Sequence, residues 1–220
     1  MAIIDKPTDY FRIKLYTGNN NTQTIAWDET DTNMKPDMLW IKSYAGNTVF
    51  EHVLGDIIRG EQKYLVPNGN AASVSNGNVI NTFNTNGFSV GGATQTSESA
   101  RSYIAWGWKA SNTTASNTAG TINSTVSVNT TPGFSVVGYT GTGSGATVGH
   151  GLGVKPDMIF SKPYSTTGDW NIYHDSFSSQ QRIKLNSTAG VSTNTQIFSS
   201  LPTSTLVSIG NSGDINANGT

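Results

Sequence analysis

The sequence contains no cysteine, so neither a disulfide framework nor a thiolate metal site can form. Charged residues are also scarce: they make up 12% of the 220 residues, whereas a typical globular chain has about 25%. The 13 basic and 14 acidic residues give a net charge of −1. This balance excludes the basic stripe that nucleic-acid binding requires, and it gives no electrostatic attraction to an anionic membrane surface.

Long apolar runs are missing as well. The start of the chain, MAIIDKP, has a short apolar run that ends at Asp5, whereas a secretory signal needs about 7–15 apolar residues. No other run approaches the length of a membrane span. We therefore expect a protein that is made in a cytoplasm, has no signal peptide and does not insert into a membrane.

Two decapeptides in the sequence are nearly identical: KPDMLWIKSY at 35–44 and KPDMIFSKPY at 155–164. Segments on either side also match, in the same order and at a nearly constant offset; for example, Tyr16-Thr17-Gly18 matches Tyr139-Thr140-Gly141. The offset is far longer than the repeat of a solenoid. The pattern therefore indicates a tandem duplication of a whole domain.

The duplication predicts the domain boundaries. An N-terminal anchoring segment covers 1–8, the first domain covers 9–110, and the second covers 132–220. The segment 111–131 is almost all small and polar, which predicts a linker, although its alternating stretch TINSTVSV could add a short strand.

The second copy lacks a counterpart to one strand of the first. In the first copy Ile104, Trp106 and Trp108 alternate along 98–110, whereas the match in the second copy stops at 214–220. We expect the natural chain to continue beyond Thr220; the alternative is that another chain supplies the missing strand by edge addition.

Alternating apolar residues predict strands throughout, and helical periodicity is nearly absent. In FRIKLY, Phe11, Ile13 and Leu15 are predicted to face the core, and Arg12 and Lys14 to face water.

The second of the repeated strands gives a similar prediction. Met38 and Trp40 are assigned to the core because the second copy keeps Met158 and Phe160 at these positions. By the same alternation, Trp106 and Trp108 are assigned to core faces. Short strands separated by turns favour an all-β protein with two tandem antiparallel β-sandwich domains, concanavalin-like or jelly-roll, the second without its last strand.

No catalytic constellation stands out, so an enzyme and a bound cofactor are not expected. The three histidines do not occupy matching positions, and the paired acids that glycoside cleavage needs are not grouped on one strand. Asp37 and Asp157 are explained by the turns in which they stand. The segment DINANG places Asp214, Asn216 and Asn218 as a calcium loop would, but without the closing Glu; a polar turn is the main interpretation and calcium the alternative.

Four aromatic residues near loops are candidates for binding a glycan or a protein partner: Trp27, Tyr44, Trp170 and Tyr173. Ordinary packing in the core is the main interpretation for each, and binding is the alternative.

The motifs LYTGN, KPDMLWIK, GFSVGG and SYIAWGWKA, followed by a second GFSVVGYTGTG and KPDMI, together resemble a known family. The chain is similar to the duplicated β-rich virion structural proteins of tailed bacteriophages from marine and freshwater bacteria, which are called tail fibre-like or lectin-like. The resemblance covers nearly the whole chain, and its motifs carry no catalytic signature.

The resemblance implies a virion protein, most of all a tail or fibre component that displays lectin-like domains for attachment to the host surface. A capsid decoration or adaptor protein that binds only virion neighbours is the alternative, and a concanavalin-like glycoside-cleaving enzyme is the third possibility. The implied partners are other virion proteins, further copies of the chain and host-surface glycans.

Overall fold

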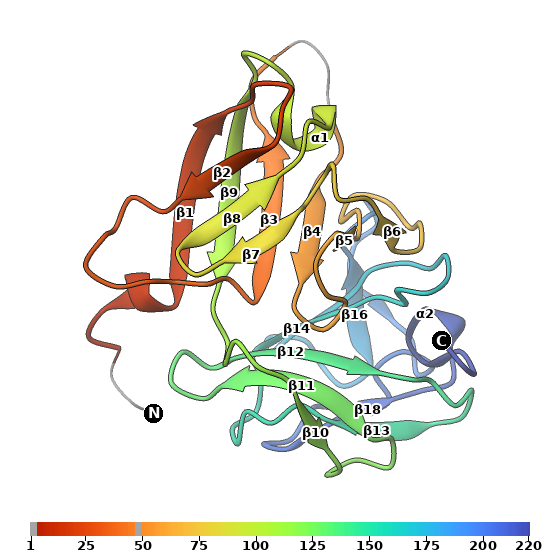
Figure 1. Ribbon diagram of the computed structural model, residues 1–220. Helices are drawn as coiled ribbons and strands as arrows, with labels where there is room; N and C mark the ends of the chain where they lie inside the picture. The colour runs from red at the N-terminus through yellow and green to blue at the C-terminus, as the bar shows by residue number, and fades with distance from the viewer. Residues whose placement is uncertain (1–3, 47–49) are drawn as a thin grey trace. The chain divides into compact units, whose positions relative to one another are not determined.

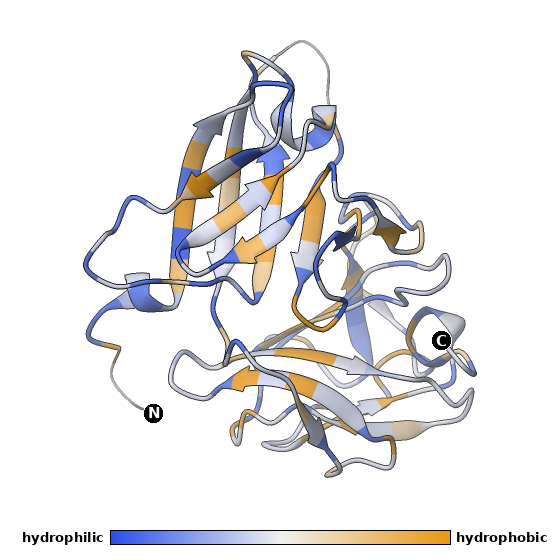
Figure 2. Cartoon of the chain, viewed as in Figure 1, coloured by the Kyte–Doolittle hydropathy of each residue, from blue (hydrophilic) through white to orange (hydrophobic). Residues whose placement is uncertain are grey.

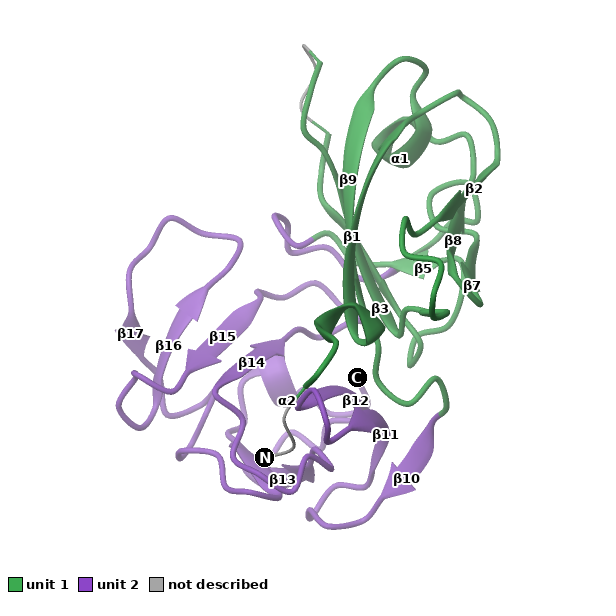
Figure 3. Ribbon diagram, turned by 90° about the vertical axis from the view of Figure 1, so that its left-hand side faces the viewer, with its two compact units in different colours: residues 1–66, 74–113 green, residues 67–73, 114–220 purple. Residues whose placement is uncertain are grey.

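The computed structural model describes residues 4–46 and 50–220 and confirms an all-β protein, with 37% strand and 5% helix. Every ladder between its named strands is antiparallel. The chain forms two compact units (Figure 3). Unit 1 contains Met1–Val66 and Val74–Thr113, and unit 2 contains Pro67–Ser73 and Thr114–Thr220.

Unit 1 is a sandwich of two sheets (Figure 1). The larger sheet has the order β1-β9-β3-β4, with β1 (Phe11–Thr17), β9 (Ser102–Trp108), β3 (Met38–Ser43) and β4 (Val53–Asp56). The smaller sheet has the order β2-β8-β7, with β2 (Gln23–Ala26), β8 (Gly87–Val90) and β7 (Thr82–Asn84). The remaining elements are the 3-10 turn η1 (Pro7–Asp9), the hairpin strands β5 (Lys63–Tyr64) and β6 (Val74–Ser75), and the helical turn α1 (Thr94–Ser97).

The core of unit 1 lies between its two sheets, and apolar residues occur on both (Figure 2). Leu39 and Ile41 of β3 are fully buried there, together with Phe88 of β8. Alternation along each strand gives two faces, and only the face toward the other sheet is sealed from water. The core therefore uses the odd-numbered residues of β3 and β9.

The predicted orientation of these strands is wrong. On β1, Ile13 and Leu15 are 46% and 56% exposed, whereas Arg12 is only 1% exposed. On β3, Met38 and Trp40 lie on the outer side and are only half-buried. The prediction failed because these strands carry apolar residues on their outer face, so hydropathy alone does not identify the side that meets the second sheet.

Trp106 and Trp108 were likewise assigned to the core, and this is wrong for the same reason. Both rings are half-buried on the outer side of β9, whereas the buried positions of that strand are Tyr103, Ala105 and Gly107. The Gly107 position is packed from inside by Trp27, since a Cβ placed there would lie 2.6 Å from the Trp27 ring.

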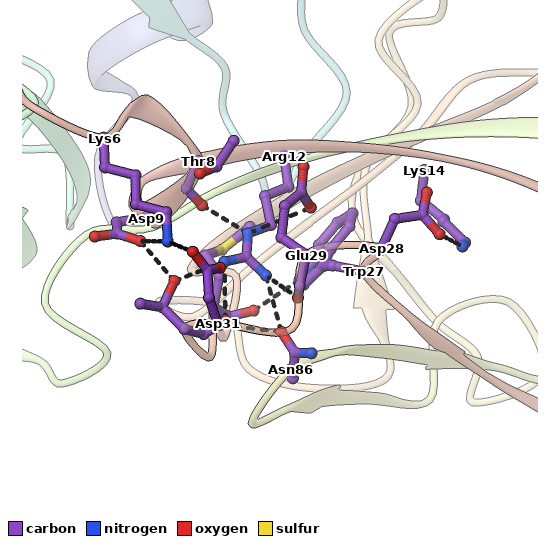
Figure 4. A network of polar contacts seen from close by, with 12 residues as sticks. Lys6, Thr8, Asp9, Arg12, Lys14, Trp27, Asp28, Glu29, Asp31 and Asn86 are labelled. Atoms are coloured by element: carbon purple, nitrogen blue, oxygen red, sulfur yellow. Dashed lines mark hydrogen bonds and ion pairs between the residues drawn. The ribbon is translucent and has the colours of Figure 1, made fainter.

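Arg12 can face inward because its guanidinium is fully hydrogen-bonded (Figure 4). It donates to the carbonyls of Thr8, Glu29 and Thr32, to the Thr32 hydroxyl and to Asn86 Oδ1, over distances of 2.6–3.1 Å. A buried charge is tolerated only when its donors are satisfied in this way. Arg12 thereby fixes the loop that follows β2 against the first residues of unit 1.

Unit 2 is built from three sheets. One has the order β10-β11-β12, with β10 (Ala115–Asn117), β11 (Ser124–Asn129) and β12 (Phe134–Tyr139); another pairs β13 (Ala146–Gly149) with β18 (Leu206–Ile209). The third has the order β14-β15-β16-β17, with β14 (Met158–Ser161), β15 (Asn171–His174), β16 (Gln181–Lys184) and β17 (Ser192–Thr193). The helical turn α2 (Gly213–Asn216) completes the unit, and its core gathers around Tyr173, Phe198 and Ile209.

The segment 111–131 is not a linker, which corrects the prediction. It supplies β10 and β11, and β11 pairs with β12 along its whole length. The alternation noticed in the sequence is the reason: Ile122 and Val126 are buried, at 7% and 4% exposure. Hydrogen bonding to β12 orders a stretch whose composition alone suggests disorder.

Many contacts of unit 1 recur in unit 2 at matching positions. Tyr16 Oη donates to the carbonyl of Thr96 over 2.8 Å, and Tyr139 Oη donates to that of Ile215 over 2.6 Å.

The same holds for the backbone. The amide of Gly18 donates to Arg101 O over 2.9 Å, and that of Gly141 donates to Thr220 O over 2.8 Å. These matched contacts are what the proposed duplication of one module predicts.

Candidate functional site

The outer side of the larger sheet of unit 1 carries a continuous set of apolar side chains. Strand pairing aligns them in cross-strand rows, such as Phe11 beside Trp108 beside Met38, and Ile13 beside Trp106 beside Trp40. We call this surface the outer face; it comprises Phe11, Ile13, Leu15, Met38, Trp40, Ile104, Trp106 and Trp108.

Ring contacts hold the outer face together. The rings of Phe11 and Trp108 have centroids 5.0 Å apart, and those of Trp40 and Trp106 are 6.4 Å apart in an edge-on arrangement. Such geometries are favourable for aromatic pairs. The outer face is therefore a pre-ordered surface rather than a set of independent side chains.

Unit 2 exposes matching positions. Met158 and Phe160 of β14 correspond to Met38 and Trp40 of β3, and they are 50% and 47% exposed. The decapeptide thus presents the same pair of apolar side chains on the outer side of both units. The sequence contained this signal, but it was interpreted as core.

The polar groups at one end of the outer face are already engaged. Trp40 Nε1 donates to His52 Nδ1 over 2.9 Å, and Lys42 Nζ donates to the carbonyl of Phe50. Burial lowers the pKa of His52, and the positive charge of Lys42 lowers it further. Burial also lowers the pKa of Lys42, with a smaller contribution from Arg101.

Acidification is expected to destabilise unit 1 through His52. Because its pKa is lower in the folded state than the ordinary value of 6.5, the unfolded chain binds the proton more readily. The stability is therefore complete above pH 6.5 and is lost as the pH falls from there through the folded-state pKa. We expect the Tm to fall more between about pH 7 and about pH 5 in the wild type than in a His52→Asn variant; thermal unfolding followed by tryptophan fluorescence measures both. Equal falls would contradict the expectation.

Three of the four aromatic residues predicted to bind a ligand lie in the interior instead. Trp27, Trp170 and Tyr173 are 2%, 4% and 1% exposed, and Trp27 Nε1 donates to Met34 O over 2.7 Å. Their rings are packed in the interior and cannot stack on a sugar or a partner. This corrects the prediction of binding for these three residues. Tyr44, at 56% exposure, is the one that stays accessible.

The geometry of DINANG disfavours calcium, which was the alternative to a polar turn. Asp214 and Asn216 belong to the helical turn α2, and Asn216 is 1% exposed. The Asn216 amide donates to Gly210 O over 2.8 Å and accepts from the amide of Thr142 over 2.8 Å, so it has no oxygen free to face a cation beside the exposed Asn218. In residues 4–46 and 50–220, no three His, Cys, Asp or Glu side chains gather in a way that could hold a metal ion.

A family model described as a domain of unknown function, DUF7483, matches residues 6–220. The chain belongs to this family. Because the match runs through both units, the DUF7483 domain as matched here includes unit 1 and unit 2 together. No curated protein and no solved structure matches the chain. Within the part of this DUF7483 protein that the structure describes, no helix is long and apolar enough to cross a membrane.

Proposed function

We propose that the protein is a structural component of a tailed-phage virion, in the tail or a fibre, and that it docks on a protein neighbour through the outer face of unit 1. The observation that carries the proposal is the exposure of Ile13 and Leu15 on a strand whose other face is sealed. A contiguous exposed apolar patch on one face of a sheet is typical of a protein interaction site.

The chemistry of the outer face suits a protein partner better than a sugar. Sugar sites combine aromatic rings with free polar groups that converge on the hydroxyls. Here Trp40 Nε1 and Lys42 Nζ already donate to His52 and Phe50, and the exposed part of the β1 edge is the aliphatic pair Ile13 and Leu15. Aliphatic side chains such as Leu15 gain most when another apolar surface removes them from water.

Attachment to host-surface glycans is the second candidate, and one observation favours it. Trp106 and Trp108 present half-buried rings on the same side of β9, and such rings stack on the apolar faces of sugars. A capsid decoration or adaptor protein would use the same protein-binding surface at a different place in the particle.

Labelling of particles tests the proposal. Antibodies against the chain, applied to purified virions of the phage that encodes it, are expected to mark the tail or fibres in electron micrographs. Labelling of the head would favour the decoration alternative. An antigen confined to the soluble lysate would overturn the proposal. Binding of the purified chain to host envelope polysaccharide, with no labelled protein neighbour, would favour glycan attachment.

A further inference from the structure

Unit 2 has two edge strands where unit 1 has a continuous sheet. In unit 1, β9 lies between β1 and β3 and pairs with both. Their counterparts in unit 2, β12 and β14, each stand at the end of a sheet: β12 pairs with β11, and β14 pairs with β15. In Figure 3 the region between β14 and β12 lies next to α2. We call this region the slot.

A hollow marks one end of the slot. Its volume is about 50 Å³, and its lining consists of Val137, Gly138, Tyr139, Lys162, Pro163, Tyr164, Ile215 and Thr220. The segment Pro67–Ser73 reaches this end, where the amide of Ser73 donates to Tyr164 O over 2.7 Å. Beyond that contact, Met158 and Phe160 of β14 stay half exposed.

The backbone hydrogen bonds at the end of the slot match those that precede β9 in unit 1. Gly18 pairs with Arg101 immediately before β9 begins, and Gly141 pairs with Thr220 in the same manner. Backbone groups of alternate residues point to the same edge of an antiparallel strand. Because the amide of Gly141 faces this edge, the amides of Val137 and Tyr139 face the slot as well.

The two Asp residues of the repeated KPD turns differ in burial and in hydrogen bonding. Asp37 is fully buried, and its carboxylate accepts from the amides of Ala110 and Asn112, just after β9. Asp157 is exposed, and its carboxylate accepts no hydrogen bond from the described part of the chain. Asp37 thus anchors the end of β9, and Asp157 is placed to anchor a strand of the same kind.

We infer that unit 2 binds an extended polypeptide strand in the slot, antiparallel to both β12 and β14. The strand has the pattern of β9: tyrosine or small residues toward the core and aromatic residues outward. In unit 1, Tyr103 of β9 stacks on Tyr16 at 5.2 Å, and Tyr139 offers the matching ring in unit 2. Main-chain hydrogen bonds supply affinity in this type of recognition, and the alternating side chains supply specificity. The inference concerns an edge of unit 2 and does not depend on the virion proposal.

A synthetic peptide with the sequence of residues 102–112, SYIAWGWKASN, is the probe, added to the 220-residue chain. We expect saturable binding, with slowed amide exchange by NMR at Val137, Tyr139 and Phe160. The amides of Val136 and Gly138 face β11 and are expected to stay unchanged.

Variants separate strand addition from general apolar contact. An Ala105→Pro version of the peptide keeps every aromatic and apolar side chain outside that position but lacks an amide that the ladder needs, so its binding is expected to be lost. In the chain, Asp157→Ala is expected to weaken binding about tenfold, the effect of losing hydrogen bonds to a charged group. Asp5→Ala, which removes an exposed acid of unit 1, is the matched control and is expected to bind as the wild type does.

Three results would overturn the inference. They are no binding of the peptide, equal binding of its Ala105→Pro version, and protection confined to amides outside β12 and β14. Concentration-dependent protection of the slot amides without peptide would instead assign the slot to a second copy of the chain.

Discussion

The Arg12→Ala variant is expected to lose about 3–5 kcal/mol of the free energy of unfolding of unit 1, the cost of removing one partner from a buried charged network. The guanidinium makes five hydrogen bonds and lies 3.7 Å from the Glu29 carboxylate. Without it, the part-buried carbonyls of Thr8 and Thr32 would lose their hydrogen bonds from the guanidinium. Denaturant unfolding followed by tryptophan fluorescence measures the loss.

Lys14→Ala is the matched control for Arg12. Lys14 is the next residue on the same face of β1, and it pairs with Asp28, whose side chain is 72% exposed. A pair of this kind contributes about 0–1 kcal/mol. If Arg12→Ala destabilises the protein no more than Lys14→Ala does, the account of the buried network is wrong.

The Gly87→Ala variant is expected to destabilise unit 1 by about 3 kcal/mol or more, because strain and overlap add at this position. Gly87 has a φ of 131°, and a Cβ placed on it would lie 2.1 Å from Ile25 O in the adjoining strand. Relief would require β2 and β8 to separate, and both strands contribute to the core.

Gly60→Ala separates the two causes. Gly60 has a φ of 86°, but a Cβ there would meet no atom within 4 Å. Strain alone costs about 1–2 kcal/mol. The same denaturant experiment gives the loss of the free energy of unfolding for both variants. Equal losses would contradict the expectation, because they would mean that the overlap with Ile25 O adds nothing to the strain.

The sequence predicted the strands better than their orientation. Period-two alternation located β1, β3 and β9, but it placed Ile13 and Trp106 in the core. A strand with apolar residues on both faces has no preferred side until the second sheet is known. The decisive contact is with β8, more than 70 residues from β1 in the chain, and hydropathy carries no information about it.

The candidate site was missed for the same reason. Trp27 and Trp170 stand near turns, so they were named as binding candidates although ordinary packing was the main interpretation, and tertiary packing buries both. The buried Arg12 was equally unforeseen, because its acceptors come from three separate loops. The absence from the second copy of a counterpart to β9 stays a prediction, since it rests on the repeat alone.

Incorporation of a face variant into particles tests the central claim most directly. The Ile13→Lys/Leu15→Lys variant places charges on exposed positions of the outer face, and the control Val74→Lys/Val191→Lys does so at exposed positions elsewhere. With each protein supplied to a phage that lacks its own copy, immunoblots of purified virions are expected to show the wild type and the control but not the face variant, although all three unfold at similar temperatures. Equal amounts of the face variant in the particles would contradict the account.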